Sequence, residues 1–224
     1  DKKYELLMNQ IELQQLDQNQ DEMTEFIRLL NKVSKNHIRE KSLFPKIEKI
    51  FSYLQVAIKQ TLSNYELFEK FENNKPIILF LFQSKIVEID ENIKKNLQTN
   101  YENSQFFSIE LNEKSVFEKE GRENFEKKRQ IGENDSYICG LIRDDSIEKF
   151  IIYINEINLP LLSEIQSSIF ETNRFLIDRK KTTLIEYAAF FGSIQIFNYL
   201  YMNDVPLSSS LWLYAIHGRN AEII

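Results

Sequence analysis

The sequence is poor in the residues that interrupt helices, because only 5 glycines and 4 prolines occur among its 224 residues. A turn-dense all-β fold needs many more of both residues to close its hairpins. Long stretches instead carry apolar residues at three- and four-residue steps among Leu, Ile, Glu, Lys and Gln, all of which favour helices. The share of hydrophobic residues, 42%, is that of a globular protein with a packed core. We therefore expect an all-α fold.

Cysteine is almost missing, since Cys139 is the only one in the chain. A single thiol excludes an intrachain disulfide and any metal site built from several thiolates. A long hydrophobic run is missing too: the longest, residues 76–82, is far shorter than a membrane span, and residues 1–10 lack the apolar stretch of a signal peptide. These features predict a soluble, intracellular, cytoplasmic protein with no membrane partner.

An excess of positive charge is also lacking, because the net charge is −6. No block of Lys and Arg is longer than Lys127-Lys128-Arg129, and Glu120, Glu123 and Glu126 surround that block. Proteins that bind nucleic acid generally present a basic patch. We therefore expect no nucleic-acid partner.

Residues 1–98 read as an N-terminal helical region. Amphipathic patterns predict helices over residues 4–16, 23–33, 45–62, 65–71 and 91–97, the last capped by Asp90. The apolar run IILFLF fits either a buried strand or a buried helix. Pro76 at its start and the lack of a partner strand nearby favour the helix. Residues 99–134 lack a sustained period and predict an irregular connection that contains one short helix, where any boundary between subdomains would fall.

Residues 178–207 carry the clearest pattern, two amphipathic segments at 184–191 and 194–202. Gly192 suits a left-handed helix cap, and Ser193 suits the N-cap of the second segment. Similar residues recur elsewhere: Ser146 stands 47 residues before Ser193, and Leu211 stands 27 residues after Leu184. This predicts helix pairs over residues 135–224, with an insertion at 161–175, a shortened connection at 208–210 and an incomplete last pair.

The stretch TLIEYAAFFG, residues 183–192, resembles the TPLHxAAxxG core of an ankyrin repeat. Leu184 and Glu186 replace the Pro and His of that motif, which places the β-hairpin fingers of ankyrin repeats in question. The chain further resembles a divergent ankyrin-like family of unknown function that is common in parasitic protists, through FFGSIQIFNYL and SLWLYAIHGRN. The resemblance implies a helical-repeat solenoid, stacked from about residue 75 or from 135, and a non-enzymatic binding scaffold.

The sequence gives little support for a catalytic or metal-binding site. Cys139 lies in the apolar YICGLI, and His37 and His217 are the only histidines, so neither a catalytic thiol nor a metal site is expected. Asp144-Asp145 could be paired carboxylates, but the offset of 47 aligns Asp145 with Gly192 and favours a turn. Phosphate-binding loops, nucleophile elbows and HExxH motifs are absent from the sequence. We expect no enzyme activity and no cofactor.

The ankyrin resemblance implies that certain positions face a concave groove that binds a protein. Phe190 and Phe191 form either an exposed aromatic anchor or, if the insertion folds over them, part of the core. Trp212 takes a core position of the motif. The predicted binding residues are Arg143, Asp144, Arg179, Lys180, Thr182, Phe190, Phe191 and His217.

Two functions are compatible with such an array. The first is a protein–protein interaction module, which acts as a scaffold through its concave face. The alternative is a structural segment of a longer protein that continues beyond Ile224 or self-associates through its open C-terminal end, because each repeat needs a neighbour or a polar cap.

Overall fold

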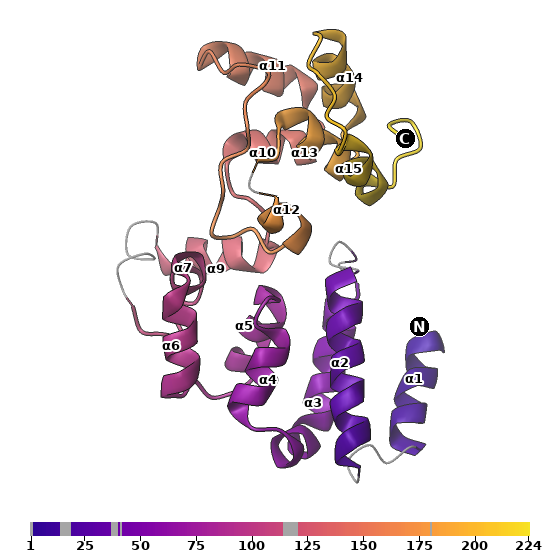
Figure 1. The fold of residues 1–224 in the computed structure, drawn as a ribbon, viewed down its shortest axis with the longest axis vertical. Helices are drawn as coiled ribbons and strands as arrows, with labels where there is room; N and C mark the ends of the chain where they lie inside the picture. The colour runs from indigo at the N-terminus through magenta and orange to yellow at the C-terminus, as the bar shows by residue number, and fades with distance from the viewer. Residues whose placement is uncertain (1, 14–18, 37–39, 41, 114–120, 180) are drawn as a thin grey trace. The chain divides into compact units, whose positions relative to one another are not determined.

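The computed structural model describes residues 2–13, 19–36, 40, 42–113, 121–179 and 181–224. In these residues the chain forms 14 α-helices and no strand, apart from one isolated antiparallel bridge between Glu164 and Thr183. The all-α expectation is confirmed. The chain divides into two compact units, residues 1–131 and 132–224 (Figure 1). Each unit has its own hydrophobic core.

Unit 1 contains eight helices among its described residues. They are α1 (Lys2–Leu13), α2 (Gln20–Asn36), α3 (Phe44–Thr61), α4 (Asn64–Phe71), α5 (Lys75–Gln83), α6 (Glu91–Thr99), α7 (Tyr101–Phe106) and α9 (Arg122–Ile131). Helices α2 and α3 pack together, as do α4 and α5 and then α6 and α7. The IILFLF run lies in α5, so the helix interpretation is confirmed.

Local caps explain where several of these helices begin. Ser63 and Glu66 form a reciprocal capping box at the start of α4, and the side chain of Asp90 accepts a hydrogen bond from the Ile93 N–H at the start of α6. Each cap satisfies backbone N–H groups that a first helical turn leaves without partners. The predicted Asp90 cap is therefore confirmed.

One expectation for unit 1 is wrong. The stretch 99–134 holds two helices in its described residues, α7 and α9, rather than one short helix. An ion pair attaches α9 to the segment after α7: the Arg129 side chain of α9 contacts both carboxylate oxygens of Glu110, at 2.6 and 3.1 Å. On α2, Val33 is exposed, and the buried position is that of Ser34, whose hydroxyl accepts a hydrogen bond from the Asn74 amide.

Unit 2 consists of helix pairs that pack side by side. Helices α10 (Tyr137–Arg143) and α11 (Ile147–Glu156) form one pair, and α13 (Leu184–Phe191) and α14 (Ile194–Met202) form the next. Helix α13 packs between α10 and α15 (Leu211–Gly218), while α11 packs on α14. Figure 1 shows α10, α13 and α15 in a row, with α11 and α14 on one side of it and α12 (Arg174–Asp178) on the other.

The turns within the two pairs have the same hydrogen bonds. The Ser146 N–H donates to the Leu141 carbonyl, and the Ser193 N–H donates to the Ala188 carbonyl. Each bond spans a turn in which the residue before the serine has a left-handed conformation, Asp145 at φ 48° and Gly192 at φ 72°. This is the Schellman arrangement that ends many helices. The turn role of Asp145 and the left-handed cap at Gly192 are confirmed.

Ser193 takes the N-cap position of α14 as predicted, but its side chain makes no capping bond, and a residue of the preceding pair supplies that bond. The Ser193 hydroxyl donates to the Ile142 carbonyl instead. The Asp145 carboxylate accepts from the Gln195 and Ile196 N–H groups, both at 3.0 Å. A negative carboxylate at this helix N-terminus is favourable because the N–H groups and the helix dipole both attract it. The turn of the first pair therefore caps α14, the second helix of the next pair.

The loops of unit 2 are tied to α13. The Ile165 N–H donates to the Thr182 carbonyl and the Leu184 N–H to the Ser163 carbonyl, so the insertion runs against the segment that enters α13. In the shortened connection, the hydroxyls of Ser208 and Ser210 both contact Oε1 of Glu186. Glu186 is buried and also caps α13 through Thr183. The insertion and the serine loop are thus held by bonds that the helix pattern alone does not reveal.

Asp145→Ala should lower the free energy of unfolding by about 1–3 kcal/mol. The change removes the α14 cap, worth roughly 0.5–2 kcal/mol, and forces alanine into a left-handed conformation that costs roughly 1 kcal/mol more. Asp144→Ala, next to it on an exposed site, should change stability by less than about 0.5 kcal/mol. Urea unfolding followed by the fluorescence of Trp212, the only tryptophan, measures both. Equal effects of the two substitutions would contradict the cap.

Gly218→Ala should detach α15 from α13. A Cβ atom on Gly218 would lie 2.2 Å from the backbone oxygen of Ala189, and a helix backbone cannot yield by so much. Gly140→Ala is the matched control, because its Cβ would meet only the end of the Arg143 side chain at 3.9 Å. That control should raise stability by up to about 1 kcal/mol. Hydrogen exchange of the α15 amides should accelerate strongly in the first variant, and unchanged protection would refute the close approach.

Candidate functional site

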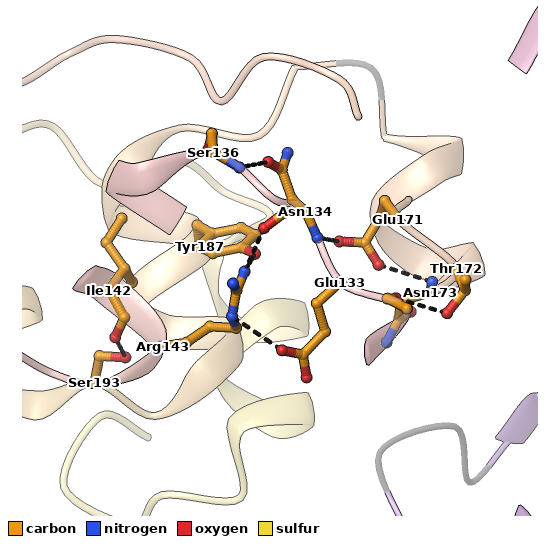
Figure 2. A network of polar contacts seen from close by, with 11 residues as sticks. Glu133, Asn134, Ser136, Ile142, Arg143, Glu171, Thr172, Asn173, Tyr187 and Ser193 are labelled. Atoms are coloured by element: carbon orange, nitrogen blue, oxygen red, sulfur yellow. Dashed lines mark hydrogen bonds and ion pairs between the residues drawn. The ribbon is translucent and has the colours of Figure 1, made fainter. Parts of the chain in front are cut away.

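Arg143, one of the predicted binding residues, lies at the centre of a polar network in unit 2 (Figure 2). At the end of α10, its guanidinium donates to the Asn134 carbonyl at 2.7 Å and to the Tyr187 hydroxyl at 3.0 Å. Its Nε also pairs with Glu133 at 2.9 Å. All three contacts come from within unit 2, and together they fix the side chain. Arg143 is therefore a charge-compensated structural residue.

A buried carboxylate joins the insertion to the entry of α10. Glu171 accepts a hydrogen bond from the Asn134 N–H at 3.2 Å and another from the Asn173 N–H at 2.8 Å (Figure 2). Next to it, the Thr172 hydroxyl and N–H both donate to the Gly132 carbonyl. These bonds hold residues 171–173 against 132–134. Burial is the main cause that raises the pKa of Glu171, and the two backbone donors partly oppose it.

Cys139 and Tyr187 are fully enclosed beside this network. Burial raises the pKa of both side chains above their ordinary values, because the ionised form of either would lie in the core. A thiol acts as a nucleophile through its thiolate, which this environment disfavours. The interpretation of Cys139 as a core residue is confirmed.

The aromatic residues that could have formed an exposed anchor do not form one. Phe190 is completely buried and Phe191 is half-buried. Phe175, at the end of the insertion, stacks on Phe190 with ring centres 5.6 Å apart and planes 11° apart. For Phe190, the alternative in which the insertion covers the ring is thus the correct one. Phe175 was missed because nothing in its sequence context links it to Phe190.

An arginine also lies against this aromatic group. The Arg179 guanidinium lies 4.5 Å from the Phe175 ring centre and 5.3 Å from that of Tyr214. Thr182 is buried, with its hydroxyl 3.2 Å from the Tyr214 hydroxyl. The exposed His217 ring lies 4.3 Å from Phe175. Arg179, Thr182, Phe190 and His217 therefore gather around Phe175 and Tyr214, where α12, α13 and α15 meet.

The other predicted residues lie elsewhere or are differently exposed. Asp144 is exposed in the turn between α10 and α11. Lys180 and His37 lie outside the described residues. Trp212, expected in the core, is 60% exposed on α15, because the neighbouring Tyr214 and Ala215 face α13 instead. The assignment of Trp212 to the core is therefore wrong.

The described residues offer no grouping typical of a metal site. Within the ranges that the structure describes, no three His, Cys, Asp or Glu side chains come together as metal ligands would. None of the described helices combines the length and apolar character needed to cross a lipid bilayer. A scan against protein-family models and searches of curated proteins and of solved structures find no match to this chain.

The titration of Glu171 should appear in the pH dependence of stability. Because its pKa is higher in the folded chain, folding favours the protonated form, and the free energy of unfolding should fall as pH rises from about 4.3 through the raised pKa. Glu171→Gln should make this slope smaller, although Glu48, whose pKa burial also raises, still contributes to it. Urea unfolding at pH values from about 4 to about 7 tests it, with exposed Glu148→Gln as control. A slope as steep in Glu171→Gln as in the unchanged chain would contradict the assignment.

Proposed function

We propose that unit 2 is a non-enzymatic protein–protein interaction module of the ankyrin type. Its partner would bind the inner row, which consists of the inner helices α10, α13 and α15. Helices α11 and α14 are the outer helices. The observation that carries the proposal is the packing order of the helices: each inner helix packs on the next inner helix, and each outer helix on the next outer helix. This order is typical of helical-repeat proteins, in which a row of equivalent positions forms an extended binding surface.

The turn chemistry supports the same proposal. The two complete pairs end their inner helices with the same hydrogen bonds, 47 residues apart. Their outer helices also end alike: the Leu159 N–H donates to the Ile154 carbonyl, and the Val205 N–H to the Leu200 carbonyl. Equivalent turns place equivalent side chains at regular steps. Asp144, Phe191 and His217, at or beside the row, and Arg179, at the end of α12, are at least partly exposed and would contact the partner.

A structural or self-associating role is the alternative, and the outer face of α15 favours it. Trp212 and Ile216 are one helical turn apart and are 60% and 52% exposed. Large apolar side chains exposed together often mark a contact surface. In this alternative a second helical surface, from another copy of the chain, would pack on α15.

The two functions can be separated by paired substitutions. Asp144→Arg with His217→Glu should abolish capture of partner proteins from a lysate of the native cell, because both change the charge of the inner row. Glu148→Arg with Asn198→Glu changes exposed residues of α11 and α14 and should leave capture intact.

Mass spectrometry of the captured proteins provides the measurement, and circular dichroism confirms that both variants are folded. Equal capture by both double variants would refute the inner row as the interface. Sedimentation at several concentrations tests the alternative: a wild-type dimer that Trp212→Ser dissociates would favour self-association.

A further inference from the structure

The two arginines that stand on the aromatic group of unit 2 differ in how their charge is compensated. The Arg143 guanidinium, 6.0 Å from the Phe191 ring centre, has Glu133 as an ion-pair partner and two further acceptors. Among the described residues, no carboxylate pairs with Arg179. The neighbouring acid, Asp178, pairs with Arg174 at 2.9 Å. Arg179 therefore presents a positive charge that unit 2 does not neutralise.

The position of Arg179 is fixed by rings rather than by counter-charges. Phe175 stacks on Phe190 and meets Tyr214 edge-on, with ring centres 5.0 Å apart and planes at 80°. The Tyr214 hydroxyl is in turn oriented by Thr182. A guanidinium held over two such rings gains cation–π stabilisation and loses side-chain freedom before any ligand binds. Arg179 is only half-buried, so part of its side chain is accessible to solvent.

We propose that Arg179 is the receptor for a carboxylate of an acidic protein segment. This inference rests on the proposed interaction function and names the chemistry of the partner. A guanidinium fork matches a carboxylate in two parallel hydrogen bonds, and a fork that is already oriented forms them at little entropic cost. Lys181, two residues after Arg179, is exposed and reaches Glu164 only at 4.0 Å. It would attract a further acidic side chain of the same segment.

The surroundings favour carboxylates over phosphates. A phosphate group carries nearly two charges and three acceptor oxygens, and proteins usually bind it with several arginines or a cluster of backbone N–H groups. Here a single fork stands on aromatic rings, and the other arginine of the row is already paired. A net charge of −6 also opposes binding to a nucleic-acid backbone. Side-chain carboxylates, spaced along a peptide, fit one fork with scattered neighbouring charges.

Fluorescence polarisation with labelled peptides tests this inference on the full chain. The probes are an oligo-glutamate peptide, an oligo-glutamine peptide of the same length, and a peptide with phosphoserine in place of glutamate. We expect the oligo-glutamate peptide to bind and the oligo-glutamine peptide not to bind. Arg179→Gln should weaken binding roughly tenfold to hundredfold, the range for a hydrogen-bonded charged pair. Arg179→Lys, which retains the charge without the fork, should weaken it by an intermediate amount.

The matched control is Lys149→Gln, which removes the same charge from an exposed position on α11. It should weaken binding less than about twofold, because screened charges far from the site contribute little. Equal losses in Lys149→Gln and Arg179→Gln would overturn the proposal in favour of unspecific attraction. Binding of the phosphoserine peptide alone, or of none, would overturn it as well. If Arg179→Gln leaves native-cell capture intact while the inner-row double variant abolishes it, only this inference fails.

Discussion

Neighbouring helix pairs of unit 2 are held in register by side chains that bind the backbone of the adjacent pair. The Asp145 carboxylate caps α14 from the turn between α10 and α11, and the Ser193 hydroxyl returns a bond to the Ile142 carbonyl. Hydrophobic packing between helices is not directional and tolerates small shifts. Hydrogen bonds to fixed N–H and carbonyl groups do not tolerate them. The order of the inner row, and every surface that it presents, depends on this register.

Hydrogen bonds between side chains and backbone also fix the path of the insertion. Glu171 accepts two backbone hydrogen bonds in the core and Thr172 donates two, so that the segment before α12 is attached at a defined place. Burying a carboxylate is costly, and bonds from N–H groups offset that cost only when both donors are in position. Once residues 171–173 are fixed, Phe175 reaches Phe190 and covers it. An apolar face thereby becomes one that carries both rings and cationic groups.

Much of the helical fold could be predicted from local sequence, whereas the site could not. The bounds of α13 and α14 follow from apolar spacing and Gly192, and the cap of α6 follows from Asp90, because these signals lie within one helical turn of the ends they set. The capping bond of α14 was misassigned to Ser193 because its real acceptor, Asp145, lies 50 residues before Gln195. The burial of Phe190 likewise depends on a residue from another loop, and the exposure of Trp212 depends on how α15 turns toward α13.

Counting charge partners separates residues that the sequence presents as equivalent. Arg143 and Arg179 both belong to the expected groove, and both approach aromatic rings. Glu133 and Tyr187 make Arg143 part of the framework of unit 2, because they compensate its charge and fix its side chain from within the unit. Arg179 is half-buried as well, but aromatic rings hold it in place of a carboxylate, and water can solvate the exposed part of its side chain. A charge that the fold does not need is one that a partner can neutralise without disturbing the core.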